Sequence, residues 1–131
     1  MQTRLGYSRT DARFTAGTFS GKTVPLVPAY KTSASISWNT GPAGTYGAAI
    51  NQVGARYFSG DLNNGNDKLG GYLTADLQAS WNLRPWTITA RLMNAFNQKY
   101  APFGVLSAAG APAYYPADGR TAFVTAHYDF R

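Results

Sequence analysis

The sequence contains no cysteine and no glutamate, and His127 is its single histidine. Without cysteine the chain cannot have a disulfide framework, a thiolate metal site or a thiol nucleophile. One histidine cannot make a recognisable zinc site, and no Gly-x-Ser-x-Gly elbow is present to form a serine nucleophile. Because no nucleophile, base and orienting group can be assembled, we expect no enzymatic activity, metal site or cofactor.

Long hydrophobic runs and charge clusters are also missing. No stretch of the 131 residues approaches the roughly 18 apolar residues of a transmembrane helix. Lys and Arg outnumber Asp by 12 to 6, but the basic residues are scattered from Arg4 to Arg131 without a run. Dispersed charge of this kind is more typical of a solvated face than of a nucleic-acid footprint, so we expect no nucleic-acid partner.

The stretch from residue 72 to residue 100 has a clear period of two. Its apolar positions are Leu73, Ala75, Leu77, Ala79 and Trp81 in one arm, and Trp86, Ile88, Ala90, Leu92 and Phe96 in the other. This alternation predicts a β-hairpin that turns at residues 82–85. Each arm of about ten residues is long for a soluble strand but matches the roughly 9–11 residues of a strand that crosses a bilayer. The hairpin therefore favours a transmembrane β-barrel.

Four further segments, residues 5–14, 29–39, 46–58 and 120–130, complete a prediction of about six strands joined as hairpins. The fold class is all-β, an antiparallel transmembrane barrel segment that is too small to close alone. Connections are long at 15–28, 59–71 and 101–119 and short at 40–45 and 82–85. Outer-membrane barrels have short periplasmic turns and long extracellular loops, which predicts three extracellular loops and a periplasmic C-terminus.

Two of the long connections contain patterns that resemble ligand sites. The segment from Gly17 to Thr23 imitates a phosphate-binding loop, but only three residues separate its glycines and Pro25 blocks the required helix. Asp61, Asn63 and Asp67 offer clustered oxygens of the kind that calcium prefers, although the helix–loop–helix calcium spacing is absent. We interpret both as plain polar loops, and cation binding by the second stays an open alternative.

Several short motifs carry a family resemblance. They are Asn94-Ala-Phe-Asn-Gln-Lys-Tyr100, Tyr115-Pro-Ala-Asp-Gly-Arg120, a closing strand that ends in Phe130, and upstream Gly21-Lys-Thr-Val-Pro-Leu-Val-Pro28, Gly54-Ala-Arg-Tyr-Phe58 and Gly71-Tyr72. In this order they resemble the C-terminal end of TonB-dependent outer-membrane receptors. Ala95 departs from the pattern because a larger apolar residue is usual there, and Arg131 departs because it follows the terminal aromatic.

The resemblance covers nearly all of residues 1–131 but only about the last third of a typical receptor. The start from Met1 to Tyr7 has no apolar core of the kind that a secretory signal requires. We therefore expect residues 1–131 to be the C-terminal part of a receptor barrel, a piece of a longer chain without its plug domain.

The resemblance implies a receptor in the cell outer membrane that takes up a scarce ligand, most often a ferric siderophore. The ligand would be released inward when the TonB complex pulls on the N-terminal plug, and the barrel assembly machinery would read the C-terminal strand at Phe130. We expect ligand contacts from aromatic residues of the long loops, namely Phe19, Phe103, Tyr114 and Tyr115. The sequence does not identify the ligand.

The apolar face of the strands is expected to contact outer-membrane lipid. Its predicted members are Trp38, Leu73, Leu77, Trp81, Trp86, Ile88, Leu92, Phe96, Val124, Tyr128 and Phe130. An aromatic girdle is expected at the periplasmic end, formed by the three tryptophans with Tyr46, Tyr128 and Phe130. The opposite girdle would contain Tyr30, Phe58, Phe96 and Phe14.

An alternative from another class is a soluble β-sandwich or small barrel that binds a sugar or another small ligand. Glycine-punctuated strands in a chain of this length fit that architecture as well. However, six long strands with a continuous apolar face would expose two unpaired edges and a broad apolar surface, which soluble domains avoid. The sequence therefore favours the membrane barrel.

Overall fold

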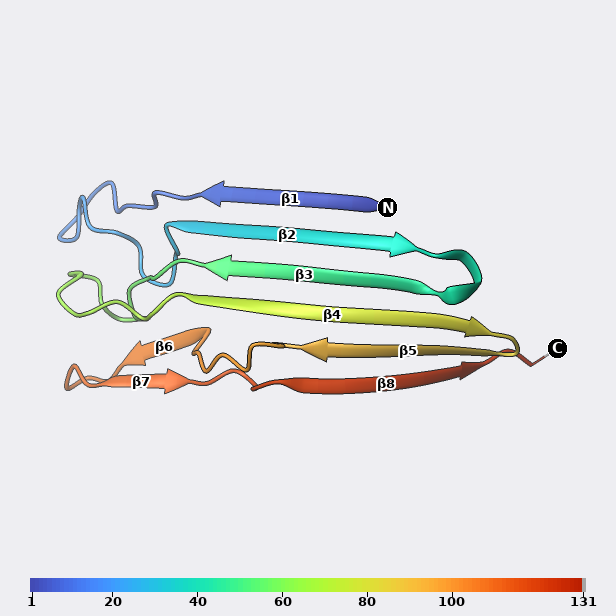
Figure 1. The fold of residues 1–131 in the computed structure, drawn as a ribbon. Coiled ribbons are helices and arrows are strands. Elements are labelled where there is room, and N and C mark those ends of the chain that lie inside the picture. Colours follow the sequence, from blue (N-terminus) through green and yellow to red (C-terminus); the bar gives the residue numbers. More distant parts are fainter. Residues whose placement is uncertain (131) are drawn as a thin grey trace.

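Six strands lie side by side in one antiparallel sheet in the computed structural model, which describes residues 1–130 (Figure 1). In sheet order they are β1 (Gln2–Arg9), β2 (Tyr30–Asn39), β3 (Thr45–Val53), β4 (Tyr72–Leu83), β5 (Trp86–Met93) and β8 (Thr121–Tyr128). Strands β6 (Phe103–Leu106) and β7 (Pro112–Tyr115) form a separate two-stranded sheet. The prediction of an all-β antiparallel fold is confirmed.

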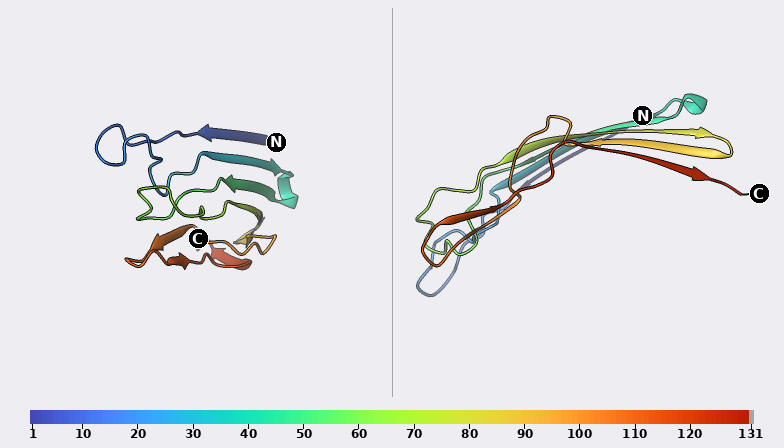
Figure 2. Two further views of the ribbon diagram at one scale, coloured as in Figure 1. Left: turned by 90° about the vertical axis from the view of Figure 1, so that its left-hand side faces the viewer. Right: turned by 90° about the horizontal axis from the view of Figure 1, so that it is seen from below.

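The large sheet is curved and open. Strand β1 pairs only with β2 and β8 pairs only with β5, so the sheet has two unpaired edges. The curvature is visible in the right-hand view of Figure 2, where the strands follow one bent surface. Within residues 1–130, no helix is long and apolar enough to cross a membrane.

Long and short connections lie at opposite ends of the sheet (Figure 1). We name the long ones the first loop (residues 10–29), the second loop (residues 54–71) and the third loop (residues 94–120), the last of which contains β6 and β7. The short ones are Arg84-Pro85 between β4 and β5, and a connection with the 3-10 helix η1 (Gly41–Ala43) between β2 and β3. Glycine is required in the latter at Gly44, whose φ is 117° and where a Cβ would lie 2.6 Å from the Ser80 carbonyl oxygen.

Several predicted strand ends were wrong, mainly at the loop end of the sheet. The first strand stops at Arg9 and the third at Val53, although the sequence predicted that they continue to residues 14 and 58. The fifth stops at Met93 because Asn94 and Asn97 adopt φ angles of 49° and 51°, which a strand cannot accommodate. Strands β6 and β7 were missed because the third loop is rich in glycine, alanine and proline.

Few side chains are buried within residues 1–130. The buried apolar ones are Phe58, Leu69 and Ala75, and the first two belong to the second loop. Large apolar side chains on the strands remain exposed, including Leu5, Leu77, Val124 and Tyr7. The densest packing is therefore among the loops, while both faces of the large sheet lack a covering layer.

Candidate functional site

Cross-strand pairing divides the large sheet into an apolar face and a polar face. Residues directly opposite each other in an antiparallel pair project to the same side. On one side, Leu77 is opposite both Ala48 and Leu92, and Ala90 is opposite both Ala79 and Val124. This side continues through Ile36 of β2, which is opposite both Thr3 and Ala48. The apolar alternation seen in separate segments therefore forms one continuous surface.

The predicted lipid-facing residues of the strands all belong to this surface by register. They are Trp38, Leu73, Leu77, Trp81, Trp86, Ile88, Leu92, Val124 and Tyr128. Phe96 and Phe130 lie beyond the ends of β5 and β8, and both side chains are exposed. Phe58 was also expected at this surface, but its side chain is 3% exposed and is packed among the loops. That prediction was wrong because β3 ends before Phe58.

Aromatic side chains cluster at the short-turn end of the apolar face. The Tyr46 ring lies 5.9 Å from the Trp38 ring and 6.3 Å from the Trp81 ring, measured between centroids. Trp81 donates its indole N–H to the Tyr46 hydroxyl (3.2 Å), which donates to the Ala43 carbonyl (2.8 Å). In a second group, Tyr128 makes edge-on contacts with Trp86 (4.9 Å between centroids) and Phe130 (4.7 Å). The structure thus places the three tryptophans at one end of the sheet.

The opposite face is mainly polar and hydroxyl-rich. Here Ser80 is opposite both Thr45 and Thr89, and the Ser80 and Thr89 hydroxyls are 3.0 Å apart. Arg91 lies in the middle of this face, opposite Gln78 and Phe123. His127 and Asp129 are 3.1 Å apart on the same face but are exposed. These groups suit contact with water. Phe123, which the sequence indicated as the exception in its strand, and Met93 are large apolar side chains on the same face.

The three long loops are joined to one another rather than independent. A parallel bridge links the second and third loops, where Ser59 N–H donates to Gly104 O and Leu106 N–H donates to Ser59 O, each at 2.9 Å. The Phe58 ring packs edge-on against Tyr114 at 5.4 Å. Gly104 is required at this contact because a Cβ there would lie 2.7 Å from the Phe58 ring.

Arg56 also holds the second and third loops together. Its side chain is buried, at 4% exposure. The guanidinium donates hydrogen bonds to the carbonyl oxygens of Ala101 and Pro102 in the third loop and of Gly54 in its own loop. It also lies 5.6 Å from the centroid of the Tyr72 ring, a cation–π distance. This role was not predicted from the sequence, because a lone arginine in a loop is normally solvated.

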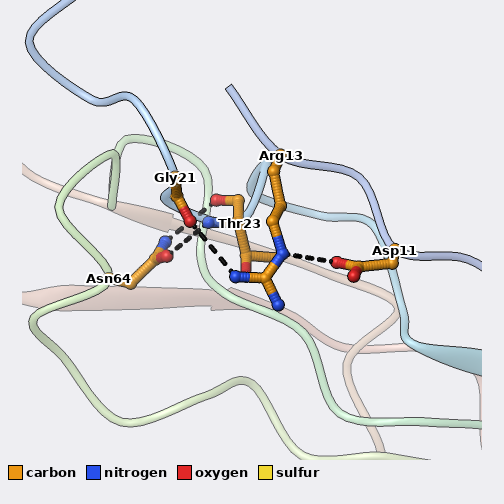
Figure 3. A network of polar contacts seen from close by, with 5 residues as sticks. All are labelled: Asp11, Arg13, Gly21, Thr23 and Asn64. Atoms are coloured by element: carbon orange, nitrogen blue, oxygen red, sulfur yellow. Dashed lines mark hydrogen bonds and ion pairs between the residues drawn. The ribbon is translucent and has the colours of Figure 1, made fainter. Parts of the chain in front are cut away.

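Asn64 joins the first loop to the second (Figure 3). Its side-chain carbonyl accepts from Thr23 N–H at 2.6 Å, and its side-chain amide donates to Thr23 O at 2.9 Å. This pair of bonds imitates one rung of a β-ladder. In the same network Arg13 donates to the Asp11 carboxylate at 2.8 Å and to Gly21 O at 3.3 Å. The segment from Gly17 to Thr23 is therefore a turn held against Arg13 and Asn64, not the start of a helix.

The motif from Asn94 to Tyr100 closes the base of the third loop. Asn94 donates its side-chain amide to Gln98 O (2.9 Å) and Asp118 O (3.3 Å), and its side-chain carbonyl accepts from Gln98 N–H (3.0 Å). Asn97 accepts from Arg120 N–H at 2.9 Å. The two asparagines thereby bring the start and end of the loop together, and both adopt the left-handed conformation that asparagine tolerates better than most residues.

Tyr100 lies beside this base in a setting that disfavours its ionisation. Its ring stacks on Tyr72 with 4.0 Å between centroids. Burial raises the pKa of the Tyr100 phenol above its ordinary value, and Tyr72, Asp76 and Asp118 raise it further. Tyr100 therefore stays neutral to a higher pH than a free tyrosine.

The structure separates the four predicted ligand-contacting aromatics into different settings. Phe103 and Tyr115 are opposite each other on the β6–β7 hairpin, with ring centroids 5.3 Å apart, and both are exposed. Tyr114 projects to the other side of the hairpin, against Phe58. Phe19 lies in the first loop and packs against Phe14 at 6.1 Å. Only Phe103 and Tyr115 thus form a pair of exposed rings.

Asp61, considered above as part of a cation site, has other partners here. Its two carboxylate oxygens accept from the backbone N–H groups of Gly65 (2.9 Å) and Asn66 (3.1 Å). The carboxylate therefore shapes the tip of the second loop. Within the described part of the chain, no group of three or more His, Cys, Asp or Glu side chains is arranged to hold a metal ion.

Comparison with known proteins extends these observations. No curated protein sequence matches the chain. Among solved structures, the ferric yersiniabactin uptake receptor FyuA from Yersinia pestis is 27% identical with a TM-score of 0.69, and the match covers 86% of this chain and 18% of that one. The siderophore receptor PiuA from Acinetobacter baumannii is 19% identical with a TM-score of 0.77, covering 95% and 18%. BauA, the ferric preacinetobactin receptor from Acinetobacter baumannii, is 21% identical with a TM-score of 0.69, covering 98% and 20%.

The chain thus spans about a fifth of the length of these solved relatives. At the level of sequence, a family profile described as "TonB dependent receptor-like, beta-barrel" matches residues 1–95. This match covers β1 to β5, and the open antiparallel sheet agrees with it. The chain belongs to the TonB-dependent receptor-like β-barrel family.

Proposed function

We propose that this chain forms part of the barrel wall of an outer-membrane receptor that takes up a ferric siderophore, and that its role is transport rather than catalysis. The observation that carries the proposal is the uncovered apolar face that runs across all six strands, opposite a polar face. In a membrane barrel the apolar side meets lipid and the polar side meets the water-filled lumen. The siderophore receptors among the solved relatives support the choice of ligand class.

The domain arrangement we propose is a C-terminal barrel portion over residues 1–131, including Arg131, which lies outside the described residues. The unpaired edges of β1 and β8 would pair with other strands of the same barrel, because outer-membrane transporter barrels have about 22 strands. The plug, the TonB complex and the barrel assembly machinery are partners of the whole receptor in this proposal. Phe130, exposed beyond β8, is the residue we expect the assembly machinery to contact.

The proposed ligand surface lies on the third loop. The exposed pair Phe103 and Tyr115 offers two adjacent aromatic rings on the β6–β7 hairpin. A bridge between Ser59 and Val105 joins this hairpin to the second loop. Tyr114 and Phe19 are proposed as further contributors. Tyr114 is exposed on the other side of the hairpin, beside Phe58, and Phe19 packs against Phe14 in the first loop. Aromatic side chains dominate binding energy when they are presented on a rigid support.

The membrane position is tested by fluorescence quenching with lipids brominated at graded depths, in the receptor with any other tryptophans replaced. We expect Trp38, Trp81 and Trp86 to be quenched most strongly by shallow labels, because indole rings prefer the interface between hydrocarbon and water. The soluble alternative predicts buried tryptophans that need share no depth. Absence of quenching at every depth would show that this face never meets lipid.

The ligand surface is tested by uptake of radioiron-labelled ferric siderophore in cells that express the receptor. Replacing both Phe103 and Tyr115 with alanine should weaken ligand binding by roughly 30-fold, which corresponds to about 2 kcal/mol, the loss expected for one hot-spot residue. Uptake at low ligand concentration should fall accordingly. The amount of receptor in the outer membrane should not change. Phe96→Ala is the matched control, because this ring is also exposed but lies outside the hairpin. Equal loss of uptake per inserted receptor in the control would contradict the assignment.

A further inference from the structure

A cavity of about 210 Å³ lies near the end of β1 and the start of β2, between the first and second loops. Four cationic residues line it, namely Arg9, Arg13, Arg56 and Lys68, and the guanidinium of Arg56 is already bonded to the third loop. Asp11 is its only acidic lining residue within residues 1–130. At roughly 30 Å³ per water molecule, the cavity holds about seven waters, or one small anion with part of its hydration shell.

The structure leaves much of this positive charge unbalanced. In the described part of the chain, the salt bridges are those of Arg13 with Asp11 and of His127 with Asp129, so Arg9 and Lys68 have no carboxylate partner there. The Lys68 ammonium lies 4.9 Å from the centroid of the Tyr57 ring, which orients it without neutralising it. Like charges that share a cavity repel each other, and a bound anion would remove that repulsion.

Arg13 is held in position for such a role. Its Nε and one terminal nitrogen donate to Asp11 and Gly21, at 2.8 and 3.3 Å. Figure 3 shows the other terminal nitrogen directed away from both partners. Its backbone is fixed as well, by the bridge to Thr23 that Asn64 supports. A guanidinium that is already oriented loses little side-chain entropy when it binds an anion.

The position of Arg9 indicates where the anion comes from. Arg9 is opposite Tyr30, and it follows Leu5 and Tyr7 on the apolar face of β1. It therefore stands at the loop end of the face that we propose to be in contact with lipid. Basic side chains at such a boundary attract the phosphate groups of membrane lipids. A soluble ligand in the lumen would approach the opposite face.

We propose that this cavity binds the phosphate group of a membrane lipid at the outer surface, with Arg9, Arg13 and Lys68 as the contacting cations. Arg9 and Arg13 supply planar sets of N–H donors that match phosphate oxygens, and Lys68 supplies a point charge. The inference rests on the proposed function, because it requires the apolar face to lie in the membrane. It adds a lipid site that is separate from the proposed ligand surface on the third loop.

The test uses the native gene product that carries this chain, purified from outer membranes in detergent. Native mass spectrometry would measure the binding of dioleoyl phosphatidic acid, of dioleoylglycerol with the same acyl chains and no phosphate, and of inorganic phosphate. The variant is Arg9→Gln with Lys68→Gln, which leaves the structural bonds of Arg13 intact. The matched control is Arg120→Gln with Lys99→Gln, an exposed pair of cations that does not line the cavity.

We expect phosphatidic acid to bind the wild type, and to bind the cavity variant roughly 25-fold more weakly, given about fivefold for each of the two basic residues near a lipid surface. The control variant should bind like the wild type. Unchanged binding in the cavity variant, equal loss in the control, or equal binding of dioleoylglycerol would overturn the proposal. Inorganic phosphate binding as tightly as phosphatidic acid would show a site for soluble anions and would overturn the lipid source.

Heat-modifiable migration of the protein from the outer-membrane fraction separates this proposal from the proposed function. If the cavity variant is inserted and keeps its affinity for phosphatidic acid, the lipid-site proposal is wrong and the proposed function still stands. A protein that never enters the outer membrane would overturn both.

Discussion

Replacing Arg56 with methionine should loosen the junction between the second and third loops. Arg56 is the buried cation whose guanidinium donates to the Ala101 and Pro102 carbonyls across the junction. Methionine has a similar unbranched stem but no donor, so the substitution removes the hydrogen bonds while it keeps much of the packing. Two carbonyl oxygens would then lose their partner inside the packed region.

The expected magnitude follows from these contacts. A hydrogen bond to a charged group contributes about 1.5–3 kcal/mol, and two of them cross the junction. The cation–π contact with Tyr72 adds about 1 kcal/mol. Part of this total is offset because methionine no longer requires the burial of a charge. We therefore expect a net loss of about 3 kcal/mol in the local stability of the junction, which is a roughly hundredfold increase in its opening.

Hydrogen exchange measures this opening directly. The amide protons of Ser59 and Leu106 form the bridge between the two loops, and their protection reports the local opening free energy. Both should exchange roughly a hundredfold faster in Arg56→Met, while amides in the middle of β4 should not change. Arg120→Met is the control, because this arginine is exposed. If the protection of Ser59 and Leu106 were the same in Arg56→Met as in the wild type, the proposed role of Arg56 would be wrong.

Three further substitutions test other contacts of the loops. Gly104→Ala should destabilise the folded receptor by about 1–3 kcal/mol in denaturant unfolding, because the added Cβ would lie 2.7 Å from the Phe58 ring. Gly70→Ala is the control and should be near neutral, because a Cβ there meets no atom within 4 Å. Asn94→Ala should cost about 2 kcal/mol, since it removes three side-chain hydrogen bonds, and an unchanged melting temperature would contradict its role at the loop base. The raised pKa of Tyr100 means that this tyrosine ionises first in the unfolded state, so its contribution to stability should be full below pH 10.0 and be lost as the pH rises above it. Tyr100→Phe should flatten that fall, and an identical pH profile would refute the assignment.

The strands of the large sheet could be predicted from sequence because their two faces differ in polarity. A period of two identifies a strand wherever one side is apolar and the other polar, and the pairing of Leu77 with Leu92 places two predicted apolar positions opposite each other. The predicted turn at residues 82–85 was too long, because β4 continues to Leu83 and only Arg84 and Pro85 connect it to β5. The third strand was the weakest prediction, because Gly47 and Asn51 blur the alternation. Its end at Val53 depends on Arg56 and Phe58 turning into the loops, which is a tertiary effect.

The loop contacts could not be predicted from sequence for a physical reason. Arg56, Asn64 and Asn94 form their bonds with backbone groups up to 46 residues away, and backbone groups are the same at every position. No residue pattern therefore marks the partner. The asparagines did offer a partial signal, since Asn is one of the few residues that tolerate a left-handed conformation, and a motif with two of them suggests a sharp reversal.

The closed base of the third loop has a consequence for how such a chain can vary. The base is fixed by Asn94 and Asn97, whereas the tip is closed by its own bonds, from Ser107 N–H to Ala111 O at 2.9 Å and from Gly110 N–H to Ser107 O at 2.9 Å. Neither set of bonds depends on the other, so the residues at the tip can change while the base of the loop keeps its structure. Residues 108–109 therefore offer a place where a foreign peptide can be inserted and displayed while β8 keeps its register with β5.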